Sequence, residues 1–345
     1  MNLTRREFTT LAVAAAAGSA LTPIALAAFE APQSKRAKRG AFFDWRSVGD
    51  RARAGFGGGG NALVVASKNE AVLIDCKNFG FGPTLRNEAH EQFGALTAVI
   101  NTHHHGDHSG GNHAFTDDLP LYAQQNAKER IVQNASRTLG RVRAAGDTAL
   151  ERYRSQLPGA SKTPGGAKRA ASDLVTLFKS INTLDAKQFA PTDTFDTTKE
   201  LAVGGLTLQL HHIGPGHTDN DAFVFIPELN VLHTGDLLFY ELHPFIDMGA
   251  GASSEGWMKN CDAMLELCDA ATTVIPGHGE ITDRSGIAGQ KEYFQMVRNA
   301  MASAHKEGKS RDEAIKIELP ALADYGFEQI KERTFGSVYD EMAKN

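Results

Sequence analysis

The chain has 345 residues, of which 41% are hydrophobic and 22% are charged, and its formal net charge is −5 at pH 7. This composition is typical of a soluble globular enzyme. The acidic balance argues against DNA or RNA as a partner, because such polyanions are bound mainly through Lys and Arg. Three cysteines are too few for a disulfide framework, so we expect Cys76, Cys261 and Cys268 to be small buried hydrophobic residues.

The N-terminus has the pattern of an export signal. Residues 5–8 read Arg-Arg-Glu-Phe, an alanine-rich apolar run follows at 11–26, and Ala-Leu-Ala at 25–27 fits a cleavage site. The run is too short and too often interrupted to be a stable membrane anchor. The paired arginines resemble a twin-arginine signal peptide over residues 1–27, which predicts export by the twin-arginine machinery to the periplasm or outside the cell. An ordinary secretory signal is the alternative.

The next segment, residues 28–56, is predicted to be flexible and basic, because it contains Lys-Arg-Ala-Lys-Arg at 35–39. A single folded domain is expected from residue 57 to residue 345. It begins with a glycine run at 57–60 and a predicted β-hairpin with strands at 61–65 and 71–75.

The sequence T-H-H-H-G-D-H at 102–108 is the most informative feature of the chain, and it follows a predicted strand at 95–100. Imidazole and carboxylate groups are the ligands that suit zinc and similar divalent cations. The spacing H-x-H-x-D-H offers four such groups, on His103, His105, Asp107 and His108. His104 is expected to point away from them. A solvated histidine-rich loop is the alternative interpretation.

Three more candidate ligands follow a helical stretch at about 124–190, each of them directly after a predicted strand. The strands are expected at 206–213, 230–233 and 273–275, and the motifs after them are G-P-G-H-T with His217, T-G-D with Asp236 and P-G-H-G with His278. Tyr240 lies in an aromatic cluster just after Asp236. Helices at about 285–345 are predicted to close the chain.

These four motifs, in this order across residues 61–284, resemble the metallo-β-lactamase superfamily. The resemblance implies an α/β fold, the αββα sandwich, with a helical insertion at about 124–190 and C-terminal helices at about 285–345. It implies two metal sites that share one residue: His103, His105 and His217 for the first metal, Asp107, His108 and His278 for the second, and Asp236 as the bridge. It also places an acidic residue below the metals, so Asp75 is either a partner that orients a ligand histidine or a turn residue at a strand end.

The resemblance further implies a metallo-hydrolase with two divalent metal ions, for which zinc is the expected metal. A metal-bound hydroxide would attack the carbonyl of a cyclic amide such as a β-lactam, of an ester or lactone, or of a thioester. Asp107 and Asp236 would act in catalysis, and Tyr240 is a candidate for hydrogen bonding to the carbonyl of a small-molecule substrate. An aspartate at 236 resembles glyoxalase II and lactonases rather than lactamases that have a cysteine there.

Two other functions remain open. A non-catalytic periplasmic metal-binding protein could use the same fold, and it would be indicated by the loss of ligands, but none is lost here. A phosphodiesterase or nuclease would use the same motifs, but the export signal and the acidic charge count against it.

Replacing Arg5 and Arg6 by Lys tests the export prediction. The charge is unchanged, so a general secretory signal should tolerate the double substitution, whereas a twin-arginine signal should leave the precursor in the cytoplasm. Cell fractionation and immunoblotting measure the outcome. Normal accumulation of the double variant in the periplasm would contradict the twin-arginine assignment.

Overall fold

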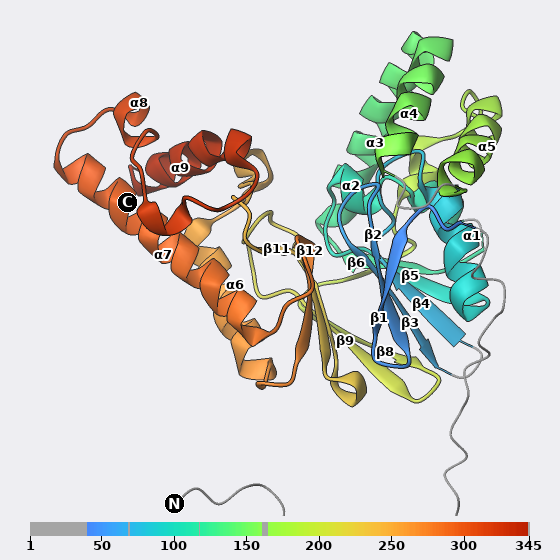
Figure 1. The fold of residues 1–345 in the computed structure, drawn as a ribbon, viewed down its shortest axis with the longest axis horizontal. Coiled ribbons are helices and arrows are strands. Elements are labelled where there is room, and N and C mark those ends of the chain that lie inside the picture. The colour runs from blue at the N-terminus through green and yellow to red at the C-terminus, as the bar shows by residue number, and fades with distance from the viewer. Residues whose placement is uncertain (1–39, 68–69, 117, 161–164, 344–345) are drawn as a thin grey trace, which may run out of the picture. The chain divides into compact units, whose positions relative to one another are not determined.

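The computed structural model describes residues 40–67, 70–116, 118–160 and 165–343, whose strands form two β-sheets (Figure 1). The strands of the first sheet have the same order in space as in the chain: β1 (Asp44–Val48), β2 (Ala52–Phe56), β3 (Ala62–Ser67), β4 (Glu70–Ile74), β5 (Leu96–Ile100), β6 (Leu121–Gln124) and β7 (Asp193–Phe195). The order in the second sheet is β12 (Thr273–His278), β11 (Val231–Phe239), β10 (Phe223–Ile226), β9 (Leu206–His211) and β8 (Thr198–Val203). The predicted signal peptide at 1–27 lies outside the described residues.

Both sheets mix antiparallel and parallel pairs. Strands β1 to β4 pair antiparallel, β4 to β7 pair parallel, and in the second sheet only the β11–β12 pair is parallel. Parallel neighbours need a crossover connection, which is usually helical. Helix α1 (Gly82–Phe93) accordingly connects β4 to β5, and α6 (Ser254–Leu267) connects β11 to β12.

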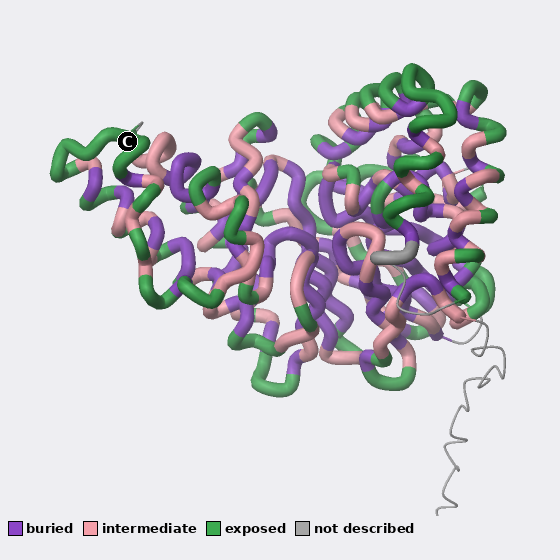
Figure 2. Tube along the Cα trace, turned by 45° about the horizontal axis from the view of Figure 1, so that its top comes forward, coloured by how far each residue is buried: buried purple, intermediate pink, exposed green. Residues whose placement is uncertain are grey.

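The two sheets face each other across a hydrophobic layer. Successive side chains of a strand point to opposite faces of its sheet, so alternate residues belong to this layer. In β3, Leu63 and Val65 belong to the cluster that also contains Leu208 and Val224 of the second sheet. The intervening Val64 belongs to a different cluster, on the outer face. The strands are therefore apolar on both sides, and Figure 2 shows the resulting buried interior.

Helices cover the outer face of each sheet, which confirms the predicted αββα sandwich (Figure 1). The first sheet is covered by α1 and by the predicted helical insertion, which consists of α3 (Ala127–Ala145), α4 (Asp147–Ala160) and α5 (Gly166–Lys179). The second is covered by α6, α7 (Arg284–Lys306), α8 (Arg311–Ala314) and α9 (Glu328–Met342). No helix in the described part of the chain is long and apolar enough to cross a membrane.

The prediction that residues 28–56 form a flexible segment is wrong for the part that the structure describes. Strands β1 and β2 lie within this range and extend the first sheet, and Phe42 and Phe43 are buried in its outer cluster. The basic run at 35–39, on which the prediction rested, lies outside the described residues. The sequence prediction gave this charge too much weight and gave too little to the apolar residues that follow.

The carboxylate of Glu88 fixes the start of this N-terminal segment. Glu88 is buried in α1 and accepts hydrogen bonds from the backbone N–H of Phe42 at 2.6 Å, from that of Phe43 at 3.3 Å and from the indole N–H of Trp45 at 2.9 Å. Burial raises the pKa of Glu88, although these three donors oppose the shift. One buried side chain therefore satisfies three donors that would otherwise lack partners.

Glu88→Gln should lower the free energy of unfolding by about 1–3 kcal/mol, because a donor group then faces donors and leaves at least one of them unpaired. Urea unfolding of the full chain measures the change. Glu266→Gln, at an exposed position of α6, is the control and should change stability by no more than about 0.5 kcal/mol. Equal stabilities of the two variants would show that the Glu88 contacts do not hold the segment.

Candidate metal centre

The structure brings all seven predicted metal ligands together, and both sheets contribute to the group. The first sheet supplies the loop after β5 and the short helix α2 (Gly106–Ser109), while the second supplies the loop after β9 and the strands β11 and β12. The seven residues are His103, His105, Asp107, His108, His217, Asp236 and His278.

Asp236 lies within its strand and not after it. The sequence predicted a strand that ends at residue 233, but β11 continues to Phe239. The pairing of β11 with β12 shifts register on both sides of Gly235, which has a φ of +52°. Such an irregularity bends a strand and re-aims its side chains. The T-G-D motif thus forms an irregularity that places the Asp236 side chain among the histidines.

The first cluster contains His103, His105, His217 and Asp236. The Nε2 atom of His217 lies 2.8 Å from Nδ1 of His105 and 3.3 Å from Oδ2 of Asp236. Nε2 of His103 lies 3.6 Å from the same carboxylate oxygen. Three imidazole nitrogens and one carboxylate oxygen therefore face a common point.

The second cluster contains Asp107, His108 and His278. Nε2 of His278 lies 3.1 Å from Oδ2 of Asp107. The other oxygen of Asp236, Oδ1, lies 3.0 Å from Nε2 of His108 and 3.4 Å from Nε2 of His278. One oxygen of Asp236 faces each cluster, which is the arrangement that a bridging ligand requires.

Each histidine of the first cluster, and His108, has a partner for its outer ring nitrogen, which for His103 is Oγ1 of Thr102 at 3.1 Å from Nδ1. Nδ1 of His108 lies 2.7 Å from Oδ2 of Asp75, and Nε2 of His105 lies 2.8 Å from Oδ2 of Asp247. Nδ1 of His217 lies 2.6 Å from the backbone carbonyl oxygen of Phe245. Such partners fix the tautomer and the orientation of a ligand histidine. Of the two interpretations left open for Asp75, the structure favours the one that orients a histidine.

The residues present fit metal ions. Nε2 of His103, Nε2 of His108 and Oδ1 of Asp236 are buried and form no well-aligned hydrogen bond among the described residues, although the last two atoms lie 3.0 Å apart and buried polar atoms nearly always form one. A Cβ atom on Gly277, in the P-G-H-G motif, would lie 2.1 Å from Oδ1 of Asp236, so only glycine leaves room there. Imidazole and carboxylate donors suit zinc. A divalent cation in each cluster would use these donor atoms.

Electrostatics also distinguish the two clusters. Burial lowers the pKa of His217 to about 3 and that of His103 well below its usual range, so both imidazoles are neutral, as metal ligands must be. Burial acts against protonation of His278 as well, but Asp236 and Asp107 raise its pKa to about 9. In the second cluster, a proton and a metal ion therefore compete for the same imidazole.

The side chains of the centre that remain exposed to solvent show where the centre is open. Asp107 is 29% exposed and His278 18%, whereas Asp236 is 3% exposed. His105 of the first cluster is 17% exposed as well, so both clusters are open to solvent and Asp236 lies behind them. His104 is buried, and its Nδ1 atom lies 3.0 Å from Nδ2 of Asn220, away from the convergence points of the two clusters.

Tyr240 contacts the centre through its backbone. Its backbone N–H donates to the carbonyl oxygen of His278 at 2.9 Å, and its side chain packs against the outer cluster of the second sheet. A Cβ on Gly286 would lie 3.1 Å from its ring. The role of its hydroxyl toward a substrate stays a prediction.

Three residues near the centre were not predicted from the sequence. Asp247 binds His105, as described above. Lys77 is fully buried and donates from Nζ to the carbonyl oxygens of Gly55 at 2.5 Å and Gly60 at 2.6 Å, and burial lowers its pKa to about 7. Arg333 of α9 lies with its guanidinium carbon 4.1 Å from the ring centre of Phe245. None belongs to a short motif, so only spatial proximity identifies them.

The chain belongs to the metallo-beta-lactamase superfamily, whose sequence pattern matches residues 55–278. It is 24% identical over 253 residues to the linear primary-alkylsulfatase of Pseudomonas sp. (strain ATCC 19151), covering 67% of this chain and 44% of that protein. It is 32% identical over 91 residues to metallo-beta-lactamase IND-1 of Chryseobacterium indologenes, covering 26% of this chain and 37% of that protein. The chain thus spans less than half of the length of these relatives, which are hydrolases.

Solved structures show the same fold. The crystal structure of DIM-1 metallo-beta-lactamase matches 74% of this chain and 98% of its own chain, with a TM-score of 0.52 and 18% identity. The sec-alkylsulfatase Pisa1 from Pseudomonas sp. matches 87% of this chain and 50% of its own, with a TM-score of 0.59 and 19% identity. The family pattern thus confirms the predicted superfamily, and these structures confirm the predicted fold.

The hydrogen bond between His105 and Asp247 can be tested by Asp247→Asn. Its bond to His105 lowers the pKa of Asp247 to about 2, so the group that holds the imidazole is a carboxylate. An amide holds the imidazole less well, and metal affinity should fall by about 10- to 100-fold. Competition with a chromogenic chelator measures this affinity.

Asp262→Asn serves as the control, because this exposed aspartate pairs with Lys291 on the surface. Its metal affinity should equal that of the unmodified protein. If Asp247→Asn also keeps full affinity, Asp247 does not orient a metal ligand.

Proposed function

We propose that the protein is an exported, binuclear zinc-dependent hydrolase that cleaves an ester, lactone, thioester or cyclic amide bond of a small molecule. The observation that carries this proposal is the shared carboxylate of Asp236, with one oxygen toward three imidazoles and the other toward His108 and His278. Two cations held side by side in this way suit hydrolysis, whereas a structural zinc site is closed by four protein ligands.

Seven residues of the chain would bind the two zinc ions, and the most exposed of them would also face the solvent. His103, His105 and His217 would hold one zinc ion, and Asp107, His108 and His278 the other, with Asp236 between them. Zinc ions bound there would activate water as a nucleophile near neutral pH and stabilise negative charge on a substrate oxygen. Asp107 is the more exposed of the two carboxylates, so it is the one placed to orient the attacking water. Although burial opposes its ionisation, it stays ionised because His108 and His278 hold its pKa well below the usual range.

Residues around the open side would orient the substrate. Phe245 lies beside His105 and His217, with ring centres 5.8 and 5.9 Å apart, and it is covered by the guanidinium of Arg333. Phe327 lies beside His278, at 5.9 Å. These aromatic faces would exclude water from an apolar substrate, and Arg333 would attract a negatively charged one. Tyr240 would donate a hydrogen bond to the substrate carbonyl.

Sulfate ester hydrolysis is a second candidate, because the similarity to an alkylsulfatase covers a larger part of this chain than the similarity to a lactamase does. The similarity to the linear primary-alkylsulfatase covers 67% of this chain, whereas that to the IND-1 lactamase covers 26%. The same pair of cations would stabilise charge on a sulfate oxygen. A non-catalytic metal-binding protein is disfavoured, because all seven ligand positions are occupied by ligand residues.

Metal analysis together with a substrate panel tests the proposal. The purified full chain should contain two zinc ions and should hydrolyse at least one of a chromogenic β-lactam, a lactone and a thioester, and a chelator should abolish this activity. Cleavage of an aryl sulfate alone would favour the second candidate, and cleavage of a phosphodiester alone would favour the nuclease alternative. A fully loaded protein that cleaves none of them would support the non-catalytic alternative.

Asp236→Ala should remove the bridge, so metal content should fall from two ions per chain and turnover should fall by orders of magnitude. His104→Ala is the matched control, because His104 lies next to two ligands but contacts Asn220. It should retain both metals. Elemental analysis of the two variants measures the difference, and equal metal loss in both would mean that the motif binds metal in another register.

A further inference from the structure

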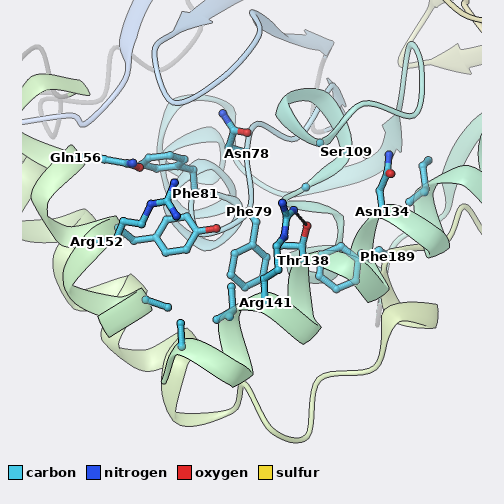
Figure 3. Close-up of a pocket in the computed structure, with 18 of the residues that line it drawn as sticks. Asn78, Phe79, Phe81, Ser109, Asn134, Thr138, Arg141, Arg152, Gln156 and Phe189 are labelled. Carbon is cyan, nitrogen blue, oxygen red and sulfur yellow. Dashed lines mark hydrogen bonds between the residues drawn. The ribbon is translucent and has the colours of Figure 1, made fainter. Parts of the chain in front are cut away.

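A cavity of about 500 Å³ lies beside the metal centre, between the helical insertion and the loop after β4 (Figure 3). Helices α3 and α4 form one side of it, and Asn78, Phe79 and Phe81 form another. Its third side is the segment Gly106–Gly110. That segment carries Asp107 and His108, so the cavity and the metal centre share a wall.

The floor of the cavity is aromatic. The ring of Phe79 lies 5.7 Å from that of Tyr153, edge to face, and 6.3 Å from that of Phe189, stacked. All three line the cavity, and Figure 3 shows Phe79 and Phe189 next to each other there. Such surfaces suit the apolar body of a small organic ligand, and the volume lies in the usual range for ligand pockets of about 300–1,000 Å³.

Two arginine side chains line the same cavity. Arg141 of α3 and Arg152 of α4 are exposed there, and neither forms a salt bridge with a carboxylate in the described part of the chain. Both also act on Tyr153: burial raises the pKa of its hydroxyl, and the two guanidinium groups oppose the shift. The surrounding helices, residues 127–160, contain seven Lys or Arg against three Asp or Glu, although the whole chain is acidic.

The arginines lie at a defined distance from the metal loop. Asn134 of α3 donates from Nδ2 to the carbonyl oxygen of His104 at 3.2 Å, which fixes this point of the helix against the loop. Arg141 follows seven residues later, but its guanidinium reaches back and donates from Nη2 to Oγ1 of Thr138 at 3.4 Å, four residues or about 6 Å along the axis from Asn134. A ligand that extends from the metal loop to Arg141 and Arg152 would cross the aromatic floor.

We propose that this cavity binds the part of the substrate that is not cleaved, and that this part is an apolar body ending in a carboxylate held by Arg141 and Arg152. The inference rests on the proposed hydrolase function and adds a substrate class to it: esters or amides of elongated organic acids with a free acid at the far end. A guanidinium group recognises a carboxylate through charge-assisted hydrogen bonds, and both arginines lie near Tyr153 in the cavity. A polymer such as a nucleic acid is disfavoured, because the basic residues surround an aromatic cavity of limited volume.

Direct binding tests the proposal without any turnover. Isothermal titration of the full chain with 6-phenylhexanoate, and with the matched neutral amide, should be done before and after the metals are removed by a chelator. The acid should bind in both states and more tightly than the amide. In the double variant Arg141→Gln, Arg152→Gln, the affinity for the acid should fall at least about 10-fold, or 1.4 kcal/mol, while that for the amide should not change.

The control is the double variant Lys128→Gln, Arg154→Gln, which removes the same charge from the same two helices at exposed positions outside the cavity lining. It should bind the acid as the unmodified protein does. Equal affinity of the acid for both double variants, or binding that requires the metals, would overturn the proposal. Absence of hydrolytic activity would count against the proposed function alone, because the binding measurement does not depend on it.

Discussion

The metal centre depends on one constraint: the buried carboxylate of Asp236 has to lie between two groups of imidazoles, each of which draws on both sheets. Although burial opposes its ionisation, His108, His278 and His103 hold its pKa well below the usual range. A charge buried in this way is stable only with several partners. The packing of the sheets, the irregularity in β11 and the absence of a side chain at Gly277 all serve to make this approach possible.

A second layer of contacts holds the first in place. Asp75 accepts hydrogen bonds from the backbone N–H and the hydroxyl of Thr102, at 2.8 Å each, and also contacts Nδ1 of His108. Lys77 holds the glycine-rich loop, and Gly60 in that loop packs directly on the ring of His108. These rigid contacts fix the ligand side chains before any metal binds, which reduces the cost of ordering them.

The inserted helices and the C-terminal helix α9 contribute side chains around the centre, whereas the two sheets supply the candidate metal ligands. The inserted helices α3 and α4 enclose an aromatic and basic cavity. On the other side of the centre lie Arg333 of α9 and Phe327, the residue that precedes this helix. The candidate metal centre thus lies between two helical regions with their own chemistry. In the function proposed above, substrate choice belongs to these regions, because function resides in sites grafted onto a shared framework.

The sequence by itself determined the fold class and pointed to the seven residues that the structure brings together, because short motifs next to strands encode local backbone geometry and side-chain chemistry together. It did not determine that residues 44–56 form strands, since their sheet partners decide this and the neighbouring charges mislead. It also did not reveal Asp247, Lys77 or Arg333. Each acts on a residue that is distant in the chain, so only the tertiary structure decides which carboxylate orients His105 and which cations line the approaches to the centre.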